Sequence, residues 1–149
     1  MKVLVSILVS LLFSQSLFGQ QLSAEQLFVT DTANQKWLTE LKAQEMPLQW
    51  KMIANRYFGN IDASSKGDNS KQNAPVLIID GIAIDITDRT SFETKTKWRS
   101  LLTEDKIASV QVIDREPDGL YINKAFTGIV LVRTNDKKIS KTLSKIKFN

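Results

Sequence analysis

Four acidic residues lie close together in the sequence and are the best candidates for chemistry: Asp80, Asp85, Asp88 and Glu93. Carboxylates in such a group could bind Ca²⁺, which takes about six to eight oxygen ligands. The spacing does not fit an EF-hand loop, because Asp80 and Asp85 are too far apart and project differently. Aspartate is also a preferred residue of turns and helix caps. We favour this structural role and expect no metal site and no cofactor.

The chain offers little else for catalysis. It has no Cys and no His among its 149 residues, which excludes disulfides, a thiol nucleophile, Cys/His metal sites and an imidazole triad. No G-x-S-x-G elbow is present, and nothing marks a sugar cleft beside a carboxylate pair. We therefore expect a protein that is not an enzyme, with a small hydrolase of unrecognised site as the less favoured alternative.

Residues 1–19 have the order of a secretory signal peptide: a positive start at Lys2, an apolar run, and a small, polar end at Gly19. The apolar run is about half the ~20 residues that a membrane span needs. A buried N-terminal helix is the weaker alternative, since the run has no polar face. We expect cleavage before Gln20 and no transmembrane span after cleavage. The expected location is the periplasm or the cell exterior, with association with the outer membrane as an alternative.

The net charge of +4 comes from the end of the chain, where five lysines lie within the last thirteen residues. Residues 136–149 are therefore predicted to form a basic, solvated tail. A more specific alternative is that this tail is weakly attracted to anionic surface polymers. Nucleic acid is not an expected partner, because a basic face interleaved with aromatic residues is absent.

The region from 20 to 60 reads as helical over residues 24–58. Trp50, Ile53, Ala54 and Tyr57 fall on one stripe of a helix, and we expect this stripe to pack on the core instead of stacking on a ligand. Pro47 separates two helical stretches and suits a first turn, and Gly59 suits a helix end. Residues 61–74 contain almost nothing that could be buried, which is typical of a linker or an exposed loop.

Residues 75–135 show strand and turn signals. Asp80-Gly81 between the apolar runs 76–79 and 82–85 predicts a hairpin, because the tight turn needs a positive φ that glycine adopts freely. Residues 108–113 alternate as a strand with one buried face. The unbroken apolar run 128–134 predicts a central strand that is covered on both faces.

A helix is expected between these strand signals. Thr90 and Glu93 have the spacing of a capping box, with the hydroxyl at the cap and the carboxylate three residues later. The helix should continue through Leu102. Residues 103–105 can then begin a short turn before the next strand.

Three blocks in this region resemble the plug domain of TonB-dependent outer-membrane receptors, especially the Bacteroidetes type. Residues 75–82 resemble the family's apolar strand with its Asp-Gly turn, and residues 102–113 are similar to the following helix-end and strand block. Residues 119–130 match a third block at Leu120, Tyr121, Ala125 and Gly128. The three blocks occur in the family's order.

The resemblance implies an α+β fold, a small mixed sheet flanked by helices on which the N-terminal helices pack. It also implies an outer-membrane or periplasmic setting, without transport, because no barrel follows residue 134. The predicted function is a non-enzymatic, plug-like module that binds an envelope protein or a small ligand. A structural role in the envelope is the alternative.

Overall fold

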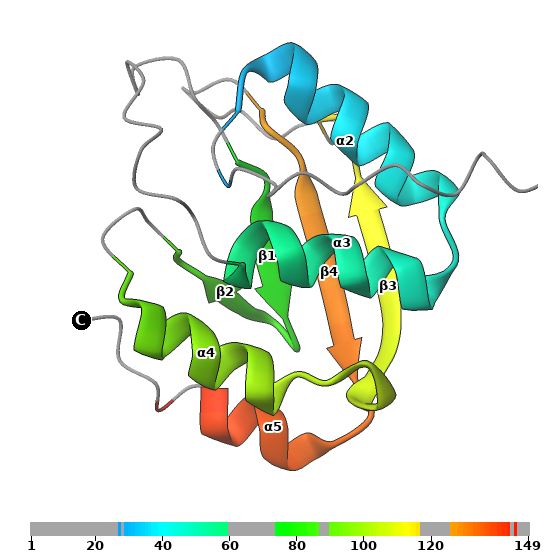
Figure 1. Cartoon of the computed structure of the whole chain (residues 1–149). Helices are drawn as coiled ribbons and strands as arrows, with labels where there is room; N and C mark the ends of the chain where they lie inside the picture. The colour runs from blue at the N-terminus through cyan, green and yellow to red at the C-terminus, as the bar shows by residue number, and fades with distance from the viewer. Residues whose placement is uncertain are drawn as a thin grey trace, which may run out of the picture.

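The computed structural model describes residues 27, 29–59, 74–86, 90–116, 126–143 and 145. Within these ranges the chain forms four α-helices, one short 3-10 helix and a four-stranded mixed sheet (Figure 1). The expected α+β class is confirmed. The predicted signal peptide at 1–19 and nearly all of the predicted linker at 61–74 lie outside the described residues.

Helix α2 spans Asp31–Ala43. Its N-cap is Thr30, whose side-chain oxygen accepts a hydrogen bond from the Ala33 N–H at 3.4 Å. The helix starts later than the predicted residue 24, because Thr30 has the extended backbone of a cap and Leu27 before it is not helical. Leu27 is nevertheless buried in the core, so the segment before the helix contributes to folding.

Helix α3 spans Met46–Phe58 and carries Pro47 in its first turn, as predicted, where the missing N–H costs no helical hydrogen bond. Gly59 ends the helix, and its N–H donates to the Asn55 carbonyl at 3.1 Å. The backbone of Gly59 is extended (φ −70°), so a left-handed conformation is not what selects glycine here. A Cβ at this position would collide with the Asn55 carbonyl oxygen.

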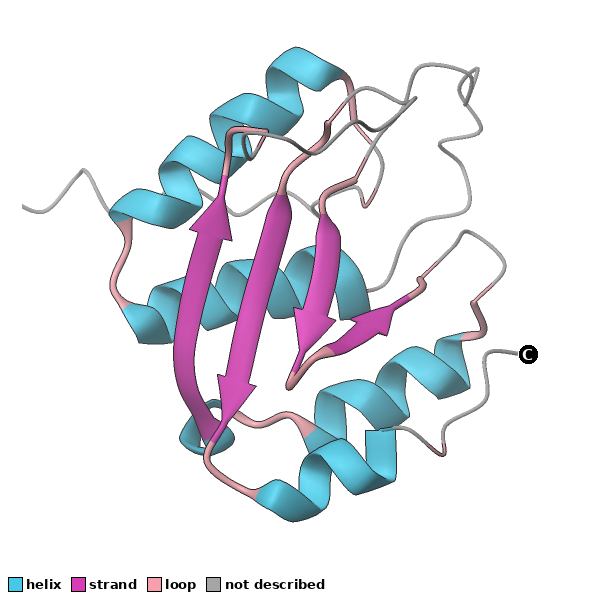
Figure 2. Ribbon diagram, turned by 180° about the vertical axis from the view of Figure 1, so that it is seen from behind, coloured by secondary structure: helices cyan, strands magenta, loops and turns pink. Residues whose placement is uncertain are grey.

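The four strands lie in the order β2-β1-β4-β3, with β1 at Val76–Ile79, β2 at Ile82–Ile84, β3 at Ile107–Ile113 and β4 at Ile129–Thr134. β1 is antiparallel to β2 and parallel to β4, and β4 is antiparallel to β3. Figure 2 shows the sheet from behind. The predicted hairpin and the predicted central strand are both confirmed, since β4 lies between β1 and β3.

Helix α4 spans Phe92–Leu101. The expected capping box is wrong by one residue: the cap is Ser91, not Thr90, and its Oγ accepts a hydrogen bond from the Thr94 N–H at 3.1 Å. Glu93 therefore lies inside the first turn. There its carboxylate pairs with the Lys97 ammonium one turn later, at 2.8 Å, instead of reaching back to the cap.

The end of the chain also differs from its prediction. Residues within the expected solvated tail form helix α5 (Lys137–Leu143). The reason is the spacing of Ile139 and Leu143, which lie one turn apart and are only 2% and 1% exposed. The lysines of this helix are exposed, while its apolar side joins the core. After α4, residues Glu104–Lys106 form the predicted short turn as the 3-10 helix η2.

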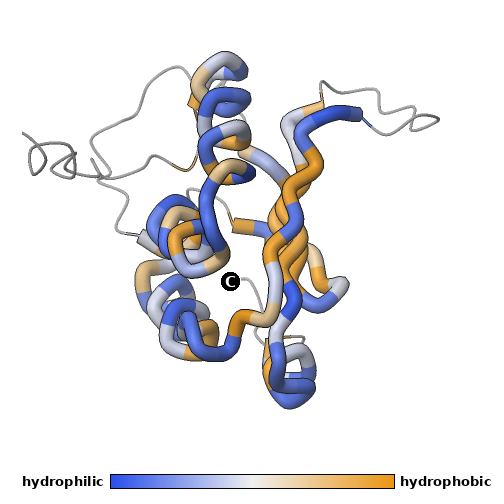
Figure 3. Tube along the Cα trace, turned by 90° about the vertical axis from the view of Figure 1, so that its right-hand side faces the viewer, coloured by the Kyte–Doolittle hydropathy of each residue, from blue (hydrophilic) through white to orange (hydrophobic). Residues whose placement is uncertain are grey.

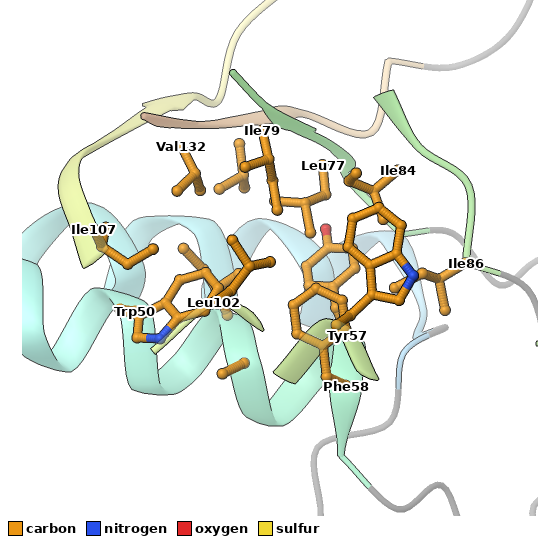
Figure 4. Packing of buried hydrophobic residues seen from close by; sticks show 14 of the residues in the cluster. Trp50, Tyr57, Phe58, Leu77, Ile79, Ile84, Ile86, Leu102, Ile107 and Val132 are labelled. Carbon is orange, nitrogen blue, oxygen red and sulfur yellow. The ribbon is translucent and has the colours of Figure 1, made fainter. Parts of the chain in front are cut away.

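The core lies between the helices and one face of the sheet (Figure 4). The predicted stripe of α3 packs inward: Trp50, Ile53, Ala54 and Tyr57 are at most 7% exposed. Phe58 stacks on Trp98 of α4 with the ring centroids 6.2 Å apart. Because burying one large apolar side chain contributes about 1.5–3 kcal/mol, this aromatic layer fixes α3 and α4 on the sheet.

The sheet has helices α2, α3 and α4 on one side (Figure 3). The prediction that β4 is covered on both faces is wrong, because its residues alternate in exposure. Val130 and Val132 are 0% and 2% exposed, whereas Ile129 and Leu131 remain partly exposed. An apolar run can therefore mark a strand with one open apolar face.

Candidate functional site

The Asp80-Gly81 turn has the geometry that the sequence predicts and one feature that it does not reveal. Asp80 and Gly81 both have positive φ, 49° and 82°, as a two-residue hairpin turn of type I′ requires. The Asp80 carboxylate also accepts hydrogen bonds from the Thr134 N–H at 2.8 Å and from the Thr134 hydroxyl at 2.5 Å. Asp80 therefore ties the hairpin to the end of β4, which is a structural task.

The other acids of the predicted cluster have separate roles. Asp85 follows β2 and is exposed, and Asp88 lies outside the described residues. Glu93 pairs with Lys97, whose hydrogen bond and charge lower the pKa of the Glu93 carboxyl. Within the described ranges, no three acidic side chains come together as a metal site would need.

Of the four residues in the plug-like motif, Gly128 is described and Leu120, Tyr121 and Ala125 are not. Gly128 has φ 99°, which favours glycine. A Cβ here would lie 2.6 Å from Leu38 Cδ1 on α2. Gly128 thus allows α2 to approach the start of β4, and its carbonyl accepts the Val76 N–H at 2.9 Å.

A buried arginine near this end of the sheet was not predicted from the sequence. Arg56 is 1% exposed. Its guanidinium donates to the Leu27 carbonyl at 3.2 Å and to Asn34 Oδ1 at 2.9 Å, and it lies over the Trp37 ring at 4.3 Å from the centroid. These contacts hold α2, α3 and the segment before α2 together.

Asn34 extends this network to the sheet. Its Nδ2 donates to the Thr127 carbonyl at 2.6 Å, and the Thr127 hydroxyl donates to the Ala74 carbonyl at 2.9 Å. The segments that enter β1 and β4 are thereby fixed to α2. The available sequence signal was the position of Asn34, a polar residue on the same helical stripe as Leu38 and Leu41.

Tyr57 adds a further bond at the entry to β1. Its hydroxyl donates to the Pro75 carbonyl at 2.7 Å. Burial raises the pKa of the Tyr57 phenol well above its usual range, against a smaller lowering effect of the Arg56 charge. The phenol is therefore a hydrogen-bond donor with no role as an acid near neutral pH.

The opposite face of the sheet, called here the open face, is the remaining candidate. Residues directly opposite each other on neighbouring strands share a face, and the register pairs Ile78 with Leu131 and Ile113 with Ile129. These side chains are partly exposed, and Val76 is 46% exposed. The apolar residues of the open face are Val76, Ile78, Ala83, Ile113, Ile129 and Leu131.

Polar residues on the open face are gathered toward one end of β3 and β4. They are Ser109, Gln111 and Arg133, all exposed, and Ser109 is paired with Arg133. The open face thus combines a row of apolar side chains with a small polar border.

No protein family, curated protein or solved structure matches this chain. A function for this chain is therefore inferred from the geometry described above. Among the described helices, none has the length and apolar character that crossing a bilayer requires.

The polar side chains described above make structural contacts. The most buried polar groups, Arg56 and Asn34, hold backbone carbonyls and each other. Asp80 holds Thr134, and Asp114 pairs with Lys42 at 3.1 Å, a contact that lowers the Asp114 pKa. These contacts keep the fold together and leave the open face as the chemically distinct surface.

Proposed function

We propose that this chain is an exported, non-enzymatic binding module with a plug-like fold, acting at the periplasmic side of a bacterial envelope. The order of charged, apolar and small residues over 1–19 supports export. The plug-like assignment is supported by Asp80, Gly81 and Gly128, which all have positive φ at motif positions of the resemblance.

The observation that carries the binding role is the open face. A row of apolar side chains on one side of a sheet exposes surface that water solvates poorly, and such patches on monomeric proteins commonly mark interaction sites. Leu131 lies on the central strand of this face and next to Ile78 and Gln111 in the register. We therefore propose a protein partner that covers this region.

Cross-linking in the producing cell tests this proposal. A photo-reactive amino acid replaces Leu131 on the open face, and a matched variant carries it at Lys36, whose side chain is 79% exposed on the outer side of α2. We expect discrete protein adducts in the periplasmic fraction from position 131 and none from position 36. Equal labelling at both positions, or no adduct at position 131, would contradict the proposal.

A further inference from the structure

The two edges of the sheet differ in how they are protected from pairing with another strand. At one edge β2 has only three residues, and very short edge strands resist strand addition. At the other edge β3 has seven residues, Ile107–Ile113, and contains neither a charged residue nor a proline. Natural proteins use charges, prolines and bulges to block such edges, and β3 has only the irregularity between Ile107 and Ser109.

The side chains of β3 that face the helices are less completely buried than those of β4. Val110 and Val112 face the helices and lie opposite Val132 and Val130 of β4. The β4 residues are 2% and 0% exposed, whereas Val110 and Val112 are only partly buried. An additional strand beside β3 would bury these two valines as β3 itself buries the valines of β4.

The helical layer extends past this edge. Helices α2 and α3 both contact β3, and the connection between them, residues 44–45, lies outside the edge strand (Figures 1 and 2). One extended segment could take a place beside β3 with this helical end on one side of it. If two copies of the chain paired through β3 about a two-fold axis, the α2–α3 connection of one copy would instead meet that of the other.

We propose that the β3 edge accepts a fifth strand: an extended, uncharged segment of another protein that alternates apolar and polar residues. Backbone hydrogen bonds to β3 would supply affinity, and apolar side chains beside Val110 and Val112 would supply specificity. Side chains of the segment that lie beside Val110 and Val112 must be uncharged, because a charge between the sheet and the helices would lose hydration without gaining a partner. This assignment rests on the proposed function and names the kind of partner.

Peptide titration followed by amide NMR tests the edge. The probe is a short synthetic peptide that alternates valine with threonine or glutamine and carries a polyethylene glycol tail for solubility. We expect shift changes concentrated on residues 109–113 and slower amide exchange in β3. A peptide of the same composition with a central proline should have no effect, because proline cannot complete the ladder of hydrogen bonds.

Two variants at one exposed position provide the control. Gln111→Lys adds a charge of the kind that natural edge strands use for protection, whereas Gln111→Ser keeps the strand neutral. We expect the lysine variant to bind the peptide about tenfold more weakly or worse and the serine variant to bind nearly as well as the wild type. Equal binding by both variants, or shift changes confined to β2, would overturn the proposal.

Two further results separate this proposal from its alternatives. If the free chain dimerises in sedimentation experiments and protects its β3 amides without peptide, the occupant is a second copy and the proposal is wrong. If cellular adducts form at position 131 and are unchanged by Gln111→Lys, the binding function stands and the edge assignment fails. If the peptide binds to β3 but no cellular adduct forms, the proposed function is wrong and the assignment of the β3 edge stands.

Discussion

The two faces of the sheet are built from similar apolar residues but differ in how far the helices bury them. Leu77 and Ile79 of β1 are 0% exposed against the helices, whereas their neighbours Val76 and Ile78 lie on the open face and stay accessible. The covered face gains its burial from α2, α3 and α4 and therefore determines the fold. The apolar side chains of the open face are less buried, and their exposure is what the proposed binding role uses.

The largest expected difference compares two adjacent residues of β1. Leu77→Ala removes a fully buried side chain and should lower the free energy of unfolding by about 2–5 kcal/mol. Ile78→Ala removes a partly exposed side chain from the open face and should cost about 1 kcal/mol or less, because less buried area is lost. Urea unfolding of both variants measures the two values. Similar losses would mean that the open face is covered in the folded protein.

Two glycines with positive φ extend the comparison. At Gly128 a side chain would meet Leu38 on the covered side, whereas at Gly81 nothing lies within 4 Å of an added Cβ. Gly81→Val should therefore cost only the backbone strain, about 1–2 kcal/mol. Gly128→Val should add the cost of overpacking, about 1–3 kcal/mol more. Thermal melting of the pair tests this order, and the reverse order would contradict the assigned packing of α2 on β4.

Tyr57 gives the covered side a dependence on pH. Its folded-state pKa is raised by burial, so the neutral phenol stabilises the fold below the unfolded-state pKa of about 10. This contribution is lost as the pH rises above about 10 toward the folded-state value. Near neutral pH the wild type should be more stable than Tyr57→Phe by the free energy of one hydrogen bond, about 0.5–1.5 kcal/mol. At alkaline pH the melting temperatures of the two proteins should converge. A constant gap between the two across the alkaline range would count against a buried Tyr57–Pro75 bond.

The smallest effect is expected at Asp85, an exposed acid beyond β2. Asp85→Asn should change stability by less than about 0.5 kcal/mol, as surface substitutions usually do. Partner capture should also be unchanged. If the variant lost a measurable activity while it remained folded, the acid would have a chemical role and the non-enzymatic interpretation would be wrong.

Local signals in the sequence predicted much of this fold. The Asp80-Gly81 hairpin, Pro47 in the first turn of α3 and the inward stripe of α3 depend on residues close in the chain, so a single sequence reveals them. The cap of α4 was misplaced because Thr90 and Ser91 are both good caps, and tertiary packing decides between neighbours. Helix α5 was missed because two apolar residues among lysines give a weak pattern.

The candidate site was less accessible to sequence reasoning. Contacts such as Asp80 with Thr134 and Asn34 with Thr127 join residues far apart in the chain, and no local pattern records them. The apolar run of β4 indicated a central strand but could not show that the helices gather on one side. The open face follows from that arrangement in space.

One comparison tests the central claim that the covered face holds the fold and the open face binds. Leu131→Lys is placed in a chain that carries a photo-reactive residue at Ile113, its neighbour on the open face, and both the melting temperature and the cellular adduct are measured. We predict a melting temperature within a few degrees of the parent chain and an adduct reduced by about tenfold or more. An undiminished adduct on a folded Leu131→Lys chain would contradict the account.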